Sequence, residues 1–108
     1  MQAAKRVIKS YLGDTIKISV NCYVNGLEGE DLSTAVVEAE FKTPVPVSPT
    51  LDVSTMDKGW FTVTVEPAMT SDIVEGQYDL LARVIMPMGE KVTVLDVLVV
   101  LAKKSITV

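Results

Sequence analysis

Residues 76–101 read GQYDLLARVIMPMGEKVTVLDVLVVL. Two long runs rich in valine, leucine and isoleucine flank a turn that contains Pro87 and Gly89. Branched aliphatic residues fit the pleated surface of a sheet, and proline and glycine mark turns. The stretch therefore predicts a long antiparallel β-hairpin, and the earlier part of the chain is expected to pack against it as shorter strands.

Three earlier segments, residues 15–24, 35–42 and 60–66, alternate apolar and polar side chains with a period of two. This period is typical of strands with one buried and one solvated face. The side chains predicted to point inward are Ile16, Ile18, Val20 and Cys22 in the first segment, Val37, Ala39 and Phe41 in the second, and Phe61, Val63 and Val65 in the third. Residues 51–53 predict one further short strand.

The connections between these segments carry their own signals. Asn25-Gly26 opens a polar connection that we expect to be longer than a tight hairpin turn. The proline-rich residues 43–49 lack ladder donors and predict an edge or a loop rather than a central strand; a ligand for a domain of the SH3 type is the less favoured interpretation. Residues 67–76 predict a crossover with one helical turn that leads into Tyr78, as in the corner tyrosine of immunoglobulin-like sandwiches.

About seven short strands, with turn signals some ten residues apart, predict an all-β fold: an immunoglobulin-like antiparallel β-sandwich. The 108 residues form one domain, 1–108, in which residues 1–12 are either a leading strand or an extended N-terminal arm.

The composition of the chain disfavours several classes of protein. The formal net charge is −4 and lysines and arginines do not cluster, which disfavours a nucleic-acid binder. The single cysteine, Cys22, excludes an intramolecular disulfide and is expected to be buried. No apolar run of signal-peptide length follows the first residues, and Asp96 interrupts the last run, which is too short to span a bilayer as a helix. We expect neither export nor a membrane partner.

The usual parts of an active site are missing from the sequence. The chain has no histidine, no glycine-rich phosphate loop and no Ser/His/Asp or Cys/His set. Glu28, Glu30 and Asp31 lack the ligand spacing of a calcium loop, so a solvated loop is the better interpretation. Glu38 and Glu40 share the wet side of one strand. We expect a non-enzymatic protein without cofactor, metal or small-molecule substrate.

The hairpin carries more apolar surface than a solvated sheet face needs. Once Tyr78 and its alternate neighbours point inward, the other side of the hairpin displays a candidate protein interface: Leu81, Arg83, Ile85, Val94, Asp96, Leu98 and Val100. Within it, Arg83 and Asp96 are expected to pair across the strands. Another subunit or a neighbouring protein would cover this face; alternatively, the N-terminal strand or the proline-rich segment folds over it.

Five motifs, taken in order, carry a family resemblance. They are Gly13-Asp14-Thr15 opening a strand, the Asn25-Gly26 loop with 31–37 after it, Gly59–Val65, Glu75–Tyr78, and the ending Ser105–Val108. The chain from Gly13 on resembles the immunoglobulin-like domain at the N-terminus of phage baseplate upper proteins and of related small tail and virion proteins. The resemblance implies a structural domain that docks onto the virion and assembles around a symmetric tail or baseplate.

The resemblance and the residues together predict a non-enzymatic phage virion structural protein. It would be a tail or baseplate component, or an adaptor, made in the host cytoplasm without a signal peptide and found in the virion. Its partners would be other virion proteins and further copies of itself. The alternatives are a capsid decoration protein and a bacterial surface immunoglobulin-like adhesion or carbohydrate-binding module, for which Trp60, Tyr11 and Tyr23 are the aromatic candidates.

Overall fold

The computed structural model describes residues 6–24, 27–28, 31–44 and 47–103. These residues form nine strands and two short helical turns. The elements are β1 (Arg6–Tyr11), β2 (Ile16–Asn21), β3 (Tyr23–Val24), β4 (Leu27–Glu28), β5 (Val36–Phe41), β6 (Thr50–Asp52), the 3-10 turn η1 (Met56–Lys58), β7 (Trp60–Val65), α1 (Pro67–Thr70), β8 (Gly76–Ile85) and β9 (Lys91–Ala102).

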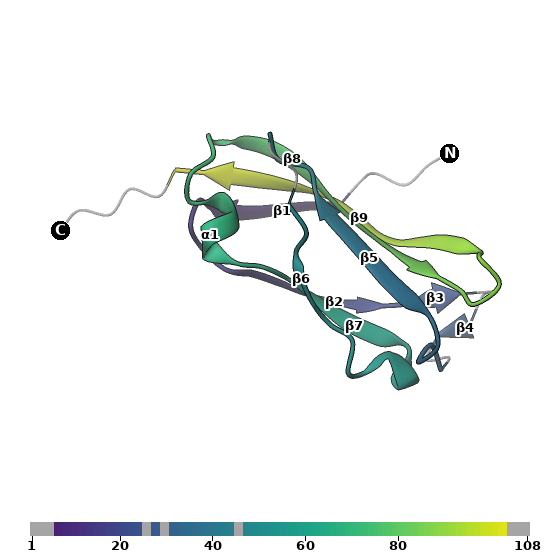
Figure 1. Cartoon of the computed structure of the whole chain (residues 1–108). Coiled ribbons are helices and arrows are strands. Elements are labelled where there is room, and N and C mark those ends of the chain that lie inside the picture. The colour runs from purple at the N-terminus through teal and green to yellow at the C-terminus, as the bar shows by residue number, and fades with distance from the viewer. Residues whose placement is uncertain (1–5, 25–26, 29–30, 45–46, 104–108) are drawn as a thin grey trace.

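Seven of the nine strands build two sheets that pack face to face (Figure 1). One sheet has four strands in the order β1-β9-β8-β5, and the other has three in the order β2-β7-β6. The remaining two strands, β3 and β4, pair with each other. The predicted all-β sandwich is confirmed, with nine strands in the described residues instead of about seven, because the short pair β3–β4 was not predicted. The strand orders β2-β7-β6 and β9-β8-β5 match the B-E-D and G-F-C orders of an immunoglobulin-like domain. The first strand departs from the constant-type arrangement, because β1 runs parallel to β9 instead of joining β2.

The core lies between the two sheets and contains the side chains that alternation predicted to point inward. Most are almost fully buried, with Phe41, Phe61, Val63 and Val65 at 0% exposure and Cys22 at 1%. Val37 and Ala39 are half-buried and pack against the same cluster. The long hairpin supplies the rest of the four-stranded sheet's inner face: Leu80, Ala82, Val84, Leu95, Val97, Val99 and Leu101.

A tight turn joins the two hairpin strands. The Met86 N–H donates to the Glu90 carbonyl at 2.7 Å, and the Gly89 N–H donates to the Met86 carbonyl at 2.8 Å. Gly89 has φ +91°, a left-handed conformation that favours glycine because it has no Cβ. The predicted turn on Pro87 and Gly89 is therefore confirmed, and it fixes the register of β8 against β9.

The expected corner tyrosine is present at the start of β8. The Tyr78 hydroxyl donates to the Val74 carbonyl, four residues earlier, at 2.7 Å. Its ring contacts Phe41 edge to face, with centroids 6.1 Å apart. This hydrogen bond anchors the crossover from β7 to the strand that carries the candidate interface.

A second hydrogen bond holds the other end of this crossover. Thr70 is fully buried in α1, and its Oγ1 accepts a hydrogen bond from the Gly13 N–H at 2.9 Å. Gly13 has φ +81° in the turn between β1 and β2. The turn that redirects the chain from one sheet to the other is thus fastened to a residue 57 positions away.

Replacing Thr70 with valine is expected to lower the free energy of unfolding by about 1–3 kcal/mol, because valine keeps the shape and leaves the Gly13 N–H without its acceptor. Urea denaturation followed by circular dichroism measures the loss. The matched control is Ser71→Ala, at the next residue, whose side chain is exposed. Its free energy of unfolding should stay within about 0.5 kcal/mol of the wild-type value. A Thr70→Val variant as stable as this control would contradict the role given to the hydroxyl.

Three segments refine the sequence expectations. The connection from residue 24 to β5, which begins at Val36, is longer than a tight hairpin turn, as predicted, but it contains a short hairpin that was not predicted, in which Val24 pairs with Leu27. Within the segment 1–12, residues 6–11 form strand β1 rather than a free arm. The described part of the proline-rich segment, residues 43–44 and 47–49, contains no strand, as predicted, and Val47 forms a single antiparallel bridge with Phe41.

Candidate protein interface

The outer face of the four-stranded sheet is the side turned away from β2, β7 and β6. Four of the predicted interface residues lie there half-buried: Leu81 and Ile85 on β8, and Leu98 and Val100 on β9. None of the four belongs to the side chains that pack against the core. Their partial burial therefore comes from their neighbours on the same sheet face, and one side of each aliphatic chain remains open to solvent.

Strand β1 widens this face. In the parallel register Val7 lies beside Leu98, Lys9 beside Val100, and Tyr11 beside Ala102. Paired residues of parallel strands point to the same side, so Val7 (50% exposed) and Tyr11 (49% exposed) join the outer face. The sequence left open whether the N-terminal strand folds over the hairpin. It extends the sheet sideways and covers none of the outer face.

Val94 was predicted to share this face, and the structure places it elsewhere. The β8–β9 ladder slips by one residue between Ala82 and Arg83, so that Ala82 opposes Leu95 and Arg83 opposes Thr93. Val94 is the extra residue of this β-bulge, and it packs against the core. Strict alternation along β9 placed the Val94 side chain on the wrong face, because a bulge inserts one residue and reverses which residues before it point outward. Thr93 takes the outward position.

The prediction that Arg83 pairs with Asp96 was wrong. Arg83 Nε donates to Glu38 Oε1 at 2.8 Å, across the β5–β8 ladder, where the two residues are direct neighbours. The register sets Asp96 opposite Leu81 instead. Both members of the Arg83–Glu38 pair are nearly half exposed, so solvent screens it and it contributes little to stability.

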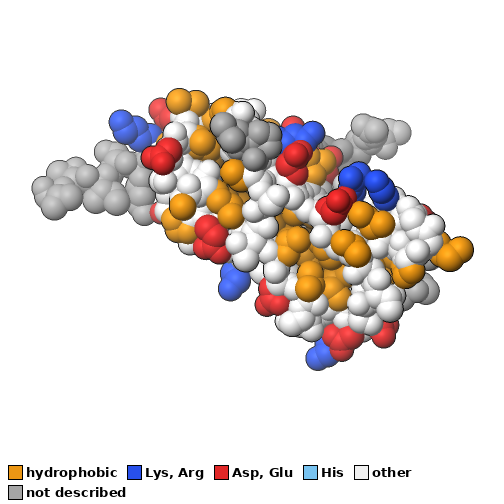
Figure 2. Space-filling model, viewed as in Figure 1, with side chains coloured by type: hydrophobic (Ala, Val, Ile, Leu, Met, Phe, Trp, Pro, Cys, Tyr) orange, Lys and Arg blue, Asp and Glu red, His pale blue; other side chains and the backbone are white. Residues whose placement is uncertain are grey.

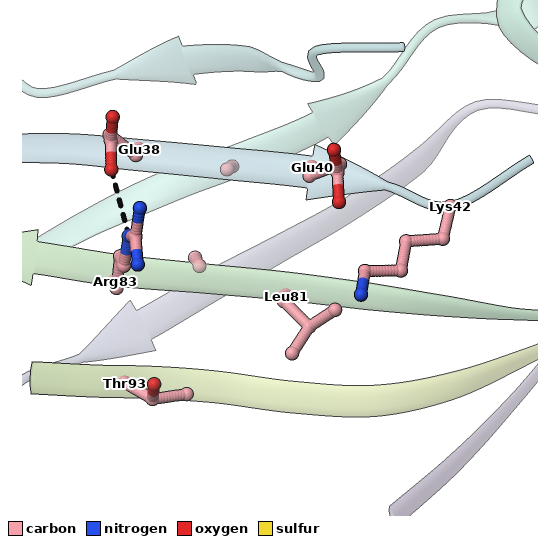
Figure 3. A pocket seen from close by; sticks show the side chains of 8 residues that line it. Glu38, Glu40, Lys42, Leu81, Arg83 and Thr93 are labelled. Carbon is pink, nitrogen blue, oxygen red and sulfur yellow. Dashed lines mark hydrogen bonds and ion pairs between the residues drawn. The ribbon is translucent and has the colours of Figure 1, made fainter. Parts of the chain in front are cut away.

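A shallow hollow of about 370 Å³ lies over β5, β8 and β9 on this face (Figure 3). The Arg83–Glu38 ion pair stands at one end, and the Lys42 side chain extends over β8 toward Leu81 at the other. Its lining residues are Glu38, Ala39, Glu40, Lys42, Leu81, Ala82, Arg83 and Thr93. The hollow combines one aliphatic side chain with charges of both signs, a composition suited to the polar rim of a protein contact.

A second concavity, the β5–β6 groove, opens on the side of the sandwich where β5 and β6 are the edge strands of their sheets. It measures about 650 Å³. Figure 2 shows apolar side chains gathered on this side of the molecule. The lining residues are Ser33, Ala35, Val36, Val37, Leu51, Val53, Ser54, Met56 and Asp57. Sequence reasoning missed this groove because its two walls come from strands that are distant in the chain.

Of the three acidic residues weighed as calcium ligands, Asp31 binds the local backbone. Asp31 Oδ1 accepts a hydrogen bond from the Ser33 N–H at 3.0 Å, and this bond holds the pKa of Asp31 below its usual value. Asp52 binds the hydroxyl and the N–H of Ser54 in the same manner, with the same effect on its pKa. The described residues contain no group of three or more metal-ligating side chains, and Glu30 lies outside them.

Two of the three aromatic candidates for a carbohydrate platform are on different sheets. Trp60 is half-buried on β7 in the three-stranded sheet, whereas Tyr11 is on β1 in the four-stranded sheet; the side chain of the third candidate, Tyr23, lies outside the described part of the structure. Two aromatic rings that stack on one sugar chain must share a surface, so these two side chains form no common platform.

No helix within the described ranges is long and apolar enough to cross a membrane. Comparison with family models, curated proteins and solved structures found no match to this chain.

Proposed function

We propose that this protein is a non-enzymatic structural component of a phage virion, a tail or baseplate subunit or an adaptor. It docks onto its neighbours through the outer face of the four-stranded sheet. The observation that carries the proposal is the row of aliphatic side chains on this face, Leu81, Ile85, Leu98 and Val100, joined at the sheet's edge by Val7. The family resemblance of the sequence supplies the virion context.

The chemistry of the face favours a protein partner. Half-exposed aliphatic side chains are interspersed there with charged ones: Leu81 lies opposite Asp96, Leu98 lies opposite Asp79, and Val100 lies beside Lys9. A protein partner can bury the aliphatic side chains and pair its own polar groups with these charges. At about 25 cal/mol per Å² of apolar area, covering these side chains contributes on the order of a few kcal/mol before the entropic cost of association.

Immunogold electron microscopy of the phage particles that carry this gene tests the proposal. An antiserum raised against the purified protein should label the tail or its end. Label on the head would favour a capsid decoration protein instead, and unlabelled particles from a culture that expresses the protein would overturn the virion assignment. Preimmune serum is the matched control.

A further inference from the structure

The two edges of the four-stranded sheet carry unused backbone hydrogen-bonding groups. At the β5 edge, Phe41 exchanges hydrogen bonds with Val47, on the side away from β8, whereas the Lys42 N–H donates to the Asp79 carbonyl of β8. The N–H and C=O groups of successive strand residues point to opposite edges. Val37 and Ala39 therefore present their N–H and C=O groups at the open edge, in phase with Phe41.

The β1 edge follows the same rule. The Leu12 N–H donates to the Ala102 carbonyl of β9, so even-numbered residues of β1 face β9. Val7 and Lys9 then point their N–H and C=O groups away from the sheet. In the described part of the chain no strand pairs with β1 on that side, nor with β5 over Val37–Ala39. Open edges of this kind are templates for strand addition.

The side chains at the two edges have opposite charge. The exposed face of β5 presents Glu38 and Glu40, and that of β1 presents Lys9; Arg6 pairs with core-facing Val97 and lies on the other face of the strand. A β5–β5 contact that uses the groups of Val37 and Ala39 would set Glu38 against Glu38 of the second copy, which is unfavourable. A contact between β5 of one copy and β1 of another sets acidic against basic residues.

Strand direction and face also agree. β1 is parallel to β9, and the two antiparallel steps from β9 to β8 and from β8 to β5 make β1 and β5 run in the same direction. A second copy that continues the sheet with its outer face on the same side thus adds β1 parallel to β5. The registers that keep outer side chains together place Lys9 beside Glu40 or Glu38 and Ile8 beside Ala39 or Val37.

The β5–β6 groove adjoins this edge and receives the inner side of the added strand. Val37 lies on both the edge and the groove wall, and Leu51, Val53 and Met56 form the opposite wall. Val53 is 49% exposed in the single chain. Ile8 of the added strand points to the inner side of the sheet, where it packs against the core of its own copy, and the groove covers the part of it that is still exposed while Lys9 stays on the solvated side.

We propose that copies of this chain join head to tail, the β1 strand of one copy adding as a parallel strand to the β5 edge of the next. Such a heterologous contact leaves one open edge at each end, so it propagates into a closed ring or a filament. The contact uses the backbone edges of the sheet, next to the margins of the outer face that carry Lys9, Glu38 and Glu40, and does not depend on a role in a virion.

Disulfide trapping tests the contact directly. Lys9→Cys is combined with Glu40→Cys in one variant and with Glu38→Cys in another, and the purified proteins are oxidised with copper phenanthroline in air. Neighbouring strands lie about 4.8 Å apart, within the Cα separation of a disulfide. Cys22 is 1% exposed, and burial raises the pKa of its thiol, so it stays unreactive in the folded protein.

The expected result is a ladder of covalent dimers, trimers and larger species on a non-reducing gel from one of the two double variants. The three single variants are the controls and should give no ladder. If the largest product were a dimer, and Lys9→Cys alone formed it equally well, the β1 edges of two copies would be meeting each other. That result would overturn the proposal. Monomer from both double variants would overturn it as well.

Charge reversal gives an independent measurement on the uncrosslinked protein. Lys9→Glu and Glu40→Lys should each lower the mass measured by light scattering at 50 mM salt, and the double variant Lys9→Glu/Glu40→Lys should restore it. Raising the salt to 500 mM should lower the mass of the wild type, because exposed charges are screened. If neither single charge reversal nor the higher salt concentration changed the measured mass, edge pairing would be refuted. Leu98→Glu, on the outer face, should leave the covalent ladder unchanged, which separates this contact from the proposed docking face.

Discussion

Replacing Val97 with glutamate is expected to prevent the protein from folding, whereas the same replacement at Leu98 is expected to leave it folded. The two residues are adjacent on β9 and point to opposite faces of the sheet: Val97 is 2% exposed in the core, and Leu98 is half-buried on the outer face. The variant at Val97 loses about 1.5–3 kcal/mol of side-chain burial and places a carboxylate in the core at a cost of several kcal/mol more. Their sum reaches the whole stability of a typical domain, about 5–15 kcal/mol.

Circular dichroism and urea denaturation measure both variants side by side. Val97→Glu should lack a cooperative transition, and Leu98→Glu should unfold near the wild-type midpoint. Light scattering over a dilution series then reports on association, which Leu98→Glu should weaken if the outer face is a docking surface between copies. An unfolded Leu98→Glu variant would mean that the outer face is part of the core and would contradict the proposed interface.

Replacing Phe41 with alanine is expected to lower the free energy of unfolding by about 3–5 kcal/mol. Phe41 is fully buried at the end of β5, and its ring meets Tyr78 edge to face at an interplanar angle of 74°. Truncation opens a cavity at the point where the corner tyrosine fastens β8. It also removes the contact that holds the Tyr78 ring, which contributes about 0.5–1.5 kcal/mol of the loss.

Two milder variants separate these contributions in the same urea titration. Phe41→Leu keeps most of the volume and should cost clearly less than Phe41→Ala. Tyr78→Phe keeps the ring and loses the 2.7 Å hydrogen bond to the Val74 carbonyl, at a cost of about 1 kcal/mol. If Phe41→Ala cost no more than Tyr78→Phe, the cavity would have closed by collapse and the corner would not depend on the ring.

Local patterns in the sequence were sufficient for most strands and their faces. Ile16, Ile18 and Val20 alternate with polar residues and are buried, because a strand turns successive side chains to opposite sides whatever its partner. Proline and glycine placed the hairpin turn for an equally local reason. The Asn25-Gly26 pair carried a short-hairpin signal as well, and the β3–β4 hairpin was missed because that signal was given too little weight.

The pairing of strands was decided by contacts between residues that are far apart in the sequence. Arg83 binds Glu38, 45 residues away, because β5 lies beside β8 in that register. Val94 turns to the core because the β8–β9 ladder takes up an extra residue there. Alternation therefore determined the two faces of each strand except on β9, where the bulge shifts the phase at Val94. The outer face, its edges and the groove are formed by strands that are distant in the sequence. Their pairing depends on the packing of the whole core, so the sequence pattern alone does not determine these surfaces.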